Sequence, residues 1–421
     1  MPSYQRPPGT LDILPADQPY WSRVRSHAKH LAELAGFERL DTPMFEATEV
    51  FARGIGQGTD VVDKEMYTFL DKGGRDLTLR PEFTAGVVRA YIENGLYVEV
   101  KPQKLYSIGP TFRYDRPQAG RYRQFTQFNA EILGEKDPAA DLEIMTLVWD
   151  LYAGLGFRDL EFELNSTGCP RCRPPYVEAL RAYYEEHEAQ ICEDCQRRLE
   201  QSPLRVLDCK EETCQPILER APHIVDFLCD ECAEHFASLR EYLELLNRRY
   251  TLNHRLVRGL DYYTKTVFEV WASGIGAQSA LCGGGRYDGL AELLGGPETP
   301  GVGVGVGLER IVIMMKELGV EPPAPRTPEV FLAYLGEEPR KKSLHLMDEL
   351  RRTDVGVYFA MGRERGLRSQ LREADKRAVR YTVILGGDEL QSGKATVRDM
   401  TSGDQVDVDL TLLVTWLRER V

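Results

Sequence analysis

The sequence predicts an α+β protein: an antiparallel sheet flanked by helices forms the core, a helical insertion interrupts that core, and a C-terminal α/β domain follows it. Three observations support this prediction. Strands and helices in the first part of the chain are segregated instead of alternating, which favours an antiparallel sheet over a doubly wound parallel one. Residues 169–250 become rich in charge and cysteine, with helical periodicity. After a proline-rich segment, 319–330, strands and helices alternate.

The first part of the core follows from its periodicity and turn signals. The expected order is a helix at 20–34, a strand that leads through Thr42-Pro43 into another helix, a hairpin around 72–74, a helix at 85–94, a hairpin at 106–134 and a helix at 139–155.

The insertion lies between two strands of one sheet, because strand character ends near FELNSTG and returns in LVRGLDYYTKTVFEVWA. The segment GVEPPAPRTPEV is dense in proline without periodicity, as is typical of a semi-rigid linker. We therefore expect a core domain at 1–325, interrupted at 169–250, and a separate domain at 326–421. The second domain is predicted to be a small α/β unit with strands VFLAYLG, VGVYFAM and YTVILGG, helices at 341–353 and 364–377, hairpin strands ATVRDM and DQVDVDL, and a terminal helix.

Composition restricts the class of protein. The chain has 421 residues, 42% hydrophobic and 28% charged, and no apolar run long enough to span a membrane. Its start, MPSYQRPPGTLDILP, lacks the apolar region of a signal peptide, so we expect a cytoplasmic protein with no membrane partner. The formal net charge of -13 argues against a general nucleic-acid coat protein. Basic residues nevertheless cluster at 113–123 and 363–380; for the second cluster, a solvated helix face is the alternative to a polyanion contact.

The hairpin at 106–134 carries polar residues where a strand is normally apolar. Because side chains alternate along a strand, Gln127, Asn129 and Glu131 share one face. The first strand ends at Arg113, which brings a planar, bidentate donor suited to phosphate beside that face. The arrangement indicates a binding site, and an ordinary half-solvated hairpin is the alternative.

The segment GVGVGVGLERIVIMM, at 301–315, alternates glycine with valine. As a strand it has a packed face and a bare face, against which a flat ring can lie. It matches a dinucleotide fingerprint weakly, because its spacing is strictly of period two. A tightly packed strand that needs small residues is the alternative. Arg310 opens the following helix, where it is placed to reach a phosphate.

Two more segments combine arginine with aromatic residues. RGLDYYTKTVFE places Arg258 beside paired tyrosines, and CGGGRYDGL supplies a glycine turn with Arg286. Each segment alone is usually structural. Together with Arg113 and the glycine strand they exceed what packing needs, and the shared pattern is arginine directed at phosphate beside an aromatic slot.

Taken together, these segments resemble the histidyl-tRNA synthetases, a family of class II aminoacyl-tRNA synthetases, over the entire chain. GFERLDTPMFE is similar to the first class motif, at the dimer interface, TFRYDRPQAGRYRQFTQFNAE to the second and GVGVGLER to the third. LVRGLDYYT and CGGGRYDG resemble the two histidine-specific signatures. The class motifs are individually degenerate, whereas RGLDYY is highly specific.

The resemblance implies a role for each candidate site residue. Histidine would be bound by Glu82, Thr84 and Gln127 at its α-amino group, by Glu131 and Tyr263 at its imidazole, by Arg258 at its carboxylate, and also by Tyr262. The α-phosphate of ATP would contact Arg113, and its β- and γ-phosphates would contact Arg121 and Arg310. Arg258 and Arg113 would act in catalysis. The acceptor end of tRNA would contact the loop residues Arg116 and Gln118.

The resemblance also implies the reaction, which is ATP-dependent attachment of L-histidine to its tRNA through histidyl-adenylate, for protein synthesis. The expected partners are a second copy of the chain in a homodimer, magnesium that accompanies ATP, and a tRNA whose anticodon the C-terminal domain reads. One rival is a regulatory paralogue that binds histidine without charging tRNA. Such relatives usually lack the C-terminal domain and an intact RGLDYY signature, and both are present here. A second rival is a sister class II synthetase of the threonyl or prolyl type.

Eight of the nine cysteines lie between 169 and 232. Their spacing fits thiolate zinc sites. The family's insertion does not in general depend on a metal, so we expect none, with zinc, disulfides and free thiols all left open. In sequence order the two sets are Cys169, Cys172, Cys192 and Cys195, then Cys209, Cys214, Cys229 and Cys232.

Overall fold

The computed structural model describes residues 4–56, 59, 61–116, 118, 120–201, 203–272, 280–324, 327–362 and 365–421. The chain divides into two compact units, Met1–Pro323 and Ala324–Val421. The division falls inside the proline-rich segment. Pro325, where we expected the core domain to end, and Arg363, where the second basic cluster was expected to begin, lie outside the described residues.

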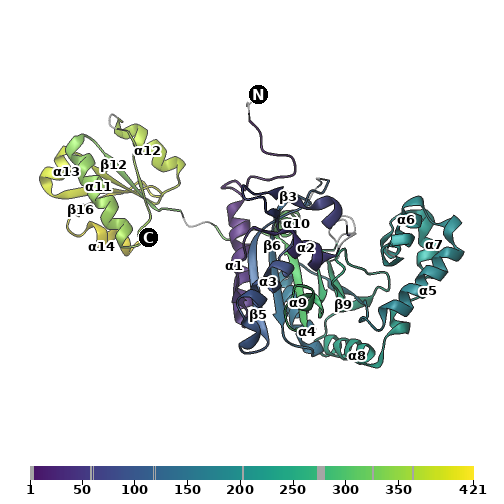
Figure 1. Cartoon of the computed structure of the whole chain (residues 1–421). Helices are drawn as coiled ribbons and strands as arrows, with labels where there is room; N and C mark the ends of the chain where they lie inside the picture. Colours follow the sequence, from purple (N-terminus) through teal and green to yellow (C-terminus); the bar gives the residue numbers. More distant parts are fainter. Residues whose placement is uncertain are drawn as a thin grey trace. The chain divides into compact units, whose positions relative to one another are not determined.

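The first unit is built on an eight-stranded mixed sheet (Figure 1). The two outer pairs, β1 with β5 and β7 with β8, are parallel, and the pairs between them are antiparallel. The predicted antiparallel core is therefore confirmed, with a parallel strand added at each edge. The order is β1 (Glu38–Arg39), β5 (Gln103–Phe112), β6 (Gln124–Leu133), β11 (Gly301–Gly307), β10 (Cys282–Arg286), β9 (Thr264–Ala272), β7 (Leu160–Ser166) and β8 (Tyr250–Leu252).

Four helices pack on one face of this sheet through the main apolar core. Alternate residues of the central strands, such as Phe128 in β6 and Val304 in β11, point into that core, as the period of two predicts. The start of one helix is well specified, because Asp137 accepts from the Ala139 amide at 2.7 Å and Pro138 follows it. The helices are α1 (Gln18–Leu34), α4 (Pro138–Gly154), α8 (Asp230–Leu245) and α10 (Leu308–Glu317).

Shorter elements lie around the opposite face, including a three-stranded sheet. The strand expected through Thr42-Pro43 is interrupted at that dipeptide. Arg80 donates to the carbonyl oxygens of Thr42 at 2.8 Å and Pro110 at 2.8 Å. The Thr42 carbonyl is therefore hydrogen-bonded to a side chain instead of to a neighbouring strand. The elements are β2 (Phe45–Ala47), α2 (Thr48–Ile55), η1 (Val61–Glu65), β3 (Tyr67–Leu70), β4 (Asp76–Leu79), α3 (Thr84–Glu93), η2 (Leu96–Val98) and α9 (Leu290–Leu293).

The insertion lies between β7 and β8 and has an apolar core of its own. Its last helix, α8, packs instead against α4 and the main sheet, where Phe236 and Leu239 join the central core. The insertion is therefore tied to the sheet where it returns. Its other elements are α5 (Arg173–Glu186), η3 (Glu188–Gln190), α6 (Glu193–Gln201), η4 (Pro203–Asp208), η5 (Glu212–Cys214), α7 (Gln215–Leu218) and η6 (Ile224–Phe227).

The second unit is the predicted small α/β domain. Its sheet has the order β13-β12-β14-β15-β16, in which the first three strands are parallel and the last two form an antiparallel hairpin. One short helix, α13, was not predicted; its start is fixed by Glu389, which accepts from the Gly386 amide at 2.9 Å. The elements are β12 (Val330–Tyr334), α11 (Glu337–Arg352), β13 (Val357–Phe359), α12 (Leu367–Lys376), β14 (Tyr381–Leu385), α13 (Gly387–Ser392), β15 (Lys394–Asp399), β16 (Gln405–Asp409) and α14 (Leu413–Arg418).

Within the described parts of the chain, every helix is too short or too polar to cross a bilayer.

Candidate active site

A cavity of about 680 Å³ opens on the face of the large sheet opposite the main apolar core. The sequence-predicted site residues that line it are Glu82, Thr84, Arg113, Arg121, Gln127, Arg258, Tyr262, Tyr263 and Arg310. They come from five separate segments of the chain, and the fold brings them together.

Glycines form the bottom of this cavity. In the register of β6 and β11, Gln127, Asn129 and Glu131 stand opposite Gly307, Gly305 and Gly303. The next strand, β10, continues the row with Gly283 opposite Gly305. Directly opposed residues point to the same side of a sheet. On the cavity side, the three polar side chains of β6 therefore lie beside glycines, which have no Cβ atom.

The absence of Cβ atoms has a specific steric purpose. A Cβ on Gly303 would overlap the Glu131 carboxylate, one on Gly305 would overlap the Gln127 amide, and one on Gly283 would meet the Arg258 guanidinium at 2.6 Å. The predicted bare face is thus partly covered by functional side chains that lean across it.

Glu131 is a fully buried carboxyl beneath the cavity. It accepts a hydrogen bond from the Thr84 hydroxyl at 2.5 Å and another from the Tyr287 hydroxyl. Burial raises the pKa of Glu131 to about 8, against the lowering effect of these donors. Tyr287 is a site residue that we did not single out from the sequence, although it lies inside the predicted CGGGRYDGL segment.

Glu82 connects the cavity to helix α3. Its carboxylate accepts from the amides of Thr84 at 2.5 Å and Ala85 at 2.9 Å, so it satisfies the free amide groups at the helix start. Burial raises the pKa of Glu82.

Among the described residues, the buried side-chain oxygens Oε1 of Gln127 and Oδ1 of Asn129 have no hydrogen-bond partner. Buried polar atoms are normally paired, so these two acceptors indicate a place for donors from a ligand.

Arg258 lies over Gly283, beside the two buried tyrosines of its motif. Its guanidinium donates to Glu269, the residue opposite Gly283 in β9. Sequence reasoning passed over Glu269, because a glutamate at the end of a strand motif gives no sign of its partner. The pair leaves the rest of the guanidinium directed into the cavity.

Three other predicted arginines also line the cavity, namely Arg113, Arg121 and Arg310. Arg113 donates through Nε to the Pro81 carbonyl at 2.9 Å, which fixes its stem. Arg310 donates to the Ala280 carbonyl, and Arg121 pairs with Asp115 at 3.4 Å. Because each arginine has more N–H donors than these contacts use, together they present a cationic surface suited to an extended polyanion.

Three predicted residues lie elsewhere. Glu131 is below the cavity, while Arg116 and Gln118 are exposed in the β5–β6 loop and do not line it. The inclusion of Arg286 among arginines directed at phosphate is wrong. It is completely buried, donates to Asp141 at 3.0 Å and to the Glu135 carbonyl at 2.8 Å, and holds the sheet to the start of α4.

Several insertion residues also line the cavity, namely Arg198, Arg205, Asp208 and Lys210. They were not predicted, because nothing in the local sequence indicates where the insertion packs. The cavity therefore combines the sheet, the β5–β6 hairpin and the insertion.

The chemistry available is positioning and charge stabilisation. Cys282 lies opposite Val306 and belongs to the main apolar core, where burial raises the pKa of its thiol to about 12, so it stays protonated and is a poor nucleophile at neutral pH. Among the described residues, the groups that could hold a metal ion are two sets of four cysteines in the insertion, none of which lines the cavity.

Comparison with known families gives two matches. Residues 9–311 match the family described as histidyl-tRNA synthetase, and residues 329–420 match the family described as anticodon binding domain.

Individual relatives match over nearly the whole chain. A histidine–tRNA ligase of Dehalococcoides mccartyi is 48% identical over 418 residues, which is 99% of this chain and 100% of the relative. One of Pelotomaculum thermopropionicum is 48% identical over 419 residues, covering 99% and 98%. Among solved structures, apo histidyl-tRNA synthetase of S. aureus superposes with a TM-score of 0.83 at 35% identity, covering 99% and 100%.

Proposed function

This chain belongs to the histidyl-tRNA synthetase family, and from that premise we propose that its cavity binds L-histidine beside Glu131 and ATP beside the arginines. The protein is a histidine–tRNA ligase, which uses ATP to attach L-histidine to its tRNA through histidyl-adenylate. The assignments below concern which residues do this.

At the histidine end, Glu131 and Tyr263 hold the imidazole. A buried carboxyl opposite a ring N–H discriminates against side chains that lack this donor, because binding such a side chain would leave the carboxyl without its partner from the ligand. The α-amino group binds Glu82 and the unpartnered oxygen of Gln127, while Thr84 acts through its hydrogen bond to Glu131. Tyr262 closes the same side of the cavity.

At the ATP end, Arg113 contacts the α-phosphate, and Arg121 and Arg310 contact the β- and γ-phosphates. Their common cavity and spare donors support phosphate contacts by all three arginines, and the order along the phosphates follows the family resemblance. Magnesium enters as part of the MgATP substrate, since Mg²⁺ is usually held by substrate phosphates with one or two carboxylates. Two carboxylates that line the cavity are paired with arginines: Asp115 with Arg121, and Glu269 with Arg258.

In the first step a carboxylate oxygen of histidine attacks the α-phosphorus, the new O–P bond forms as the bond to pyrophosphate breaks, and pyrophosphate leaves. Arg258 and Arg113 hold the two reacting groups and stabilise the charge that develops on the α-phosphate. In the second step a terminal ribose hydroxyl of tRNA attacks the histidyl carbonyl and AMP leaves.

The remaining assignments concern architecture and partners. We assign 1–325 to the catalytic domain, 169–250 to its insertion and 326–421 to the domain that contacts the anticodon. The exposed loop residues Arg116 and Gln118 contact the acceptor end of tRNA. A homodimer in the cytoplasm is the form proposed for the working enzyme, on the basis of the first class motif and the role in protein synthesis.

These assignments depend most on Arg258, which lines the same cavity as the residues proposed to bind histidine and the arginines proposed to bind phosphate. Arg258→Ala should lower histidine-dependent exchange of pyrophosphate into ATP by about a hundredfold or more, as loss of a preorganised charge donor does. Arg249→Ala is the matched control, because that arginine is 60% exposed, pairs with Asp159 at 3.3 Å and does not line the cavity.

The assay is run with histidine and, separately, with threonine and proline. Near-normal exchange in a folded Arg258→Ala protein would remove this residue from the mechanism.

A further inference from the structure

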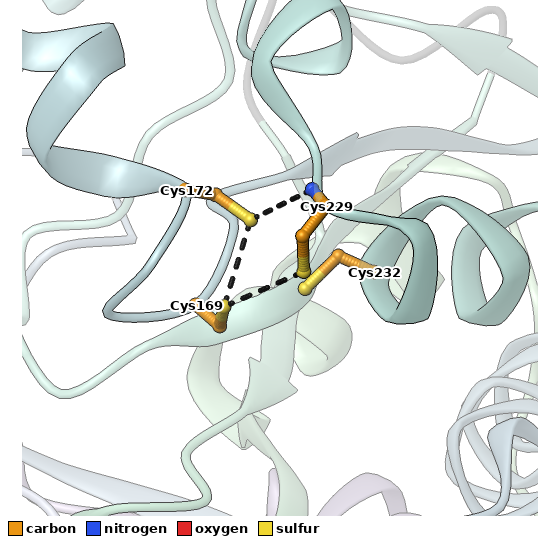
Figure 2. Close-up of side chains that lie close together, drawn as sticks. All are labelled: Cys169, Cys172, Cys229 and Cys232. Atoms are coloured by element: carbon orange, nitrogen blue, oxygen red, sulfur yellow. Dashed lines mark hydrogen bonds between the residues drawn. The ribbon is translucent and has the colours of Figure 1, made fainter.

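Eight cysteines of the insertion form two compact groups. The first group consists of Cys169, Cys172, Cys229 and Cys232, shown in Figure 2. The second consists of Cys192, Cys195, Cys209 and Cys214. In each group all four sulfur atoms lie within 4.8 Å of one another.

This pairing differs from the two sets read in sequence order, so that reading was wrong. The first Cys-x2-Cys pair meets the last one, and the four central cysteines meet each other. The reason is that β7 and β8 are parallel, so the chain that leaves the end of β7 has to run back along α8 to reach the start of β8. The beginning of α5 and of α8 therefore lie together.

In each group two sulfur–sulfur distances are close to the edge length of a mononuclear tetrahedral site, and all the others are at most 4.8 Å. A Zn–S bond of about 2.3 Å gives tetrahedral S···S edges of about 3.8 Å. The observed values are 3.5 Å for Cys169 to Cys172 and 3.9 Å for Cys169 to Cys229. In the second group Cys192 lies 3.8 Å from Cys209, and Cys195 lies 4.0 Å from Cys214.

Other occupants fit less well. A disulfide needs a sulfur separation of about 2.05 Å, and none of these contacts approaches it. A polynuclear iron–sulfur cluster distributes its thiolates over separate irons and so holds them further apart.

The surroundings supply hydrogen bonds to sulfur, as zinc thiolates require. The Cys229 amide donates to the Cys172 sulfur at 3.1 Å, and the Arg171 side chain lies 3.6 Å from the Cys229 sulfur. In the second group, the Cys192 amide donates to the sulfur of Cys214 at 3.2 Å. Four protein ligands leave no open coordination position, which is the character of a structural site.

We propose that the insertion binds two structural zinc ions, one in each group of four cysteines. This replaces the expectation of no metal, which came from the family resemblance, because the sulfur geometry comes from this chain. The first ion fastens the base of the insertion, next to Arg173, which donates to the backbone carbonyl of Tyr263 in the histidine-binding motif. The second ion links Cys195 in α6 to Cys209, which directly follows η4, and η4 carries Arg205 to the cavity.

The test is elemental analysis of the full chain, purified with reductant and passed over a chelating resin. Two zinc ions per chain are expected. Cys169→Ser with Cys232→Ser should leave one tightly bound ion, and so should Cys195→Ser with Cys214→Ser. If the sets read in sequence order held metal, the first double variant would damage both sites and leave none. Cys282→Ser is the matched control, because this cysteine is outside both groups, and it should keep two ions.

A second measurement covers variants that fail to fold. Mercurial titration of the unaltered chain in the presence of a zinc indicator should release two ions as eight thiols react, and cobalt substitution should give the visible spectrum of tetrahedral thiolate cobalt. Eight free thiols without metal, stoichiometric iron, or disulfides found by mass spectrometry would each overturn the proposal.

Discussion

Replacing Glu131 with glutamine should stabilise the empty protein and weaken histidine binding at the same time. The carboxyl is fully buried, and burial raises its pKa from 4.5 to about 8. A glutamine amide has the same shape, can accept from Thr84 and can donate to the Tyr287 oxygen. The substitution therefore removes the cost of a buried acid and keeps both hydrogen bonds.

The sign and size follow from proton linkage. Below pH 4.5 the acid is protonated in both the folded and unfolded states and costs nothing. As pH rises toward 8, the unfolded chain loses the proton and the folded chain keeps it, so the free energy of unfolding falls. At about 1.4 kcal/mol per pH unit, the loss reaches about 3 kcal/mol by pH 7.

The assay is urea unfolding of both proteins between pH 5 and 8. Glu131→Gln should gain up to about 3 kcal/mol near pH 7 and less than about 1 kcal/mol near pH 5. In pyrophosphate exchange the KM for histidine should rise roughly tenfold to a hundredfold, with the KM for ATP little changed, because an amide, unlike the carboxyl, cannot give up a proton to form a charge-assisted contact with the ring. Glu298→Gln, 69% exposed, is the control for a change of charge alone.

An equal free energy of unfolding for the two proteins at pH 5 and pH 8 would refute the claim that Glu131 is a costly buried acid. Equal increases in both KM values would refute its assignment to the histidine ring.

Three other substitutions or truncations test the remaining structure. Gly303→Ala should lower kcat/KM for histidine at least about tenfold, because its methyl group overlaps the Glu131 carboxylate, whereas Gly289→Ala, with open space around its Cβ, should not; equal activities would contradict the steric argument. Arg286→Met should destabilise the catalytic unit by about 3–5 kcal/mol in urea, because it removes the cation that pairs with the buried Asp141 carboxylate and leaves that carboxylate its contact with His235, and normal stability would show that the arginine pair is dispensable. A chain ending at Pro323 should keep pyrophosphate exchange but lose most tRNA charging, more so at high salt; full charging by a truncated protein shown by sedimentation to be dimeric would show that the second unit is not needed to recognise tRNA.

Local patterns predicted the parts of the fold that depend on a fixed period. The alternation in β6 correctly separated Gln127 and Glu131 from Phe128, because a strand turns every second residue to the same face. The glycine strand was predicted for the same reason. Neither pattern required knowledge of a distant residue.

Long-range pairing was where sequence reasoning failed. Arg286 was grouped with phosphate-directed arginines, because residue type identifies a cation but not its partner, and the partner Asp141 is 145 positions away. Tyr287 and Glu131 are 156 positions apart, so their contact was equally invisible. The cysteine sets were misread for a related reason, since spacing along the chain does not say which helices of an insertion return to its base.

Glu82 joins the substrate cavity to the first turn of a helix. Its carboxylate accepts from two backbone amides of α3 and also faces the cavity, so any cation that binds it shares this acceptor with the helix start. If the α-amino group of histidine binds Glu82, as we propose, the strength of that turn depends on whether histidine is bound. Because α3 packs against both α2 and α9, the effect would then extend to those two helices.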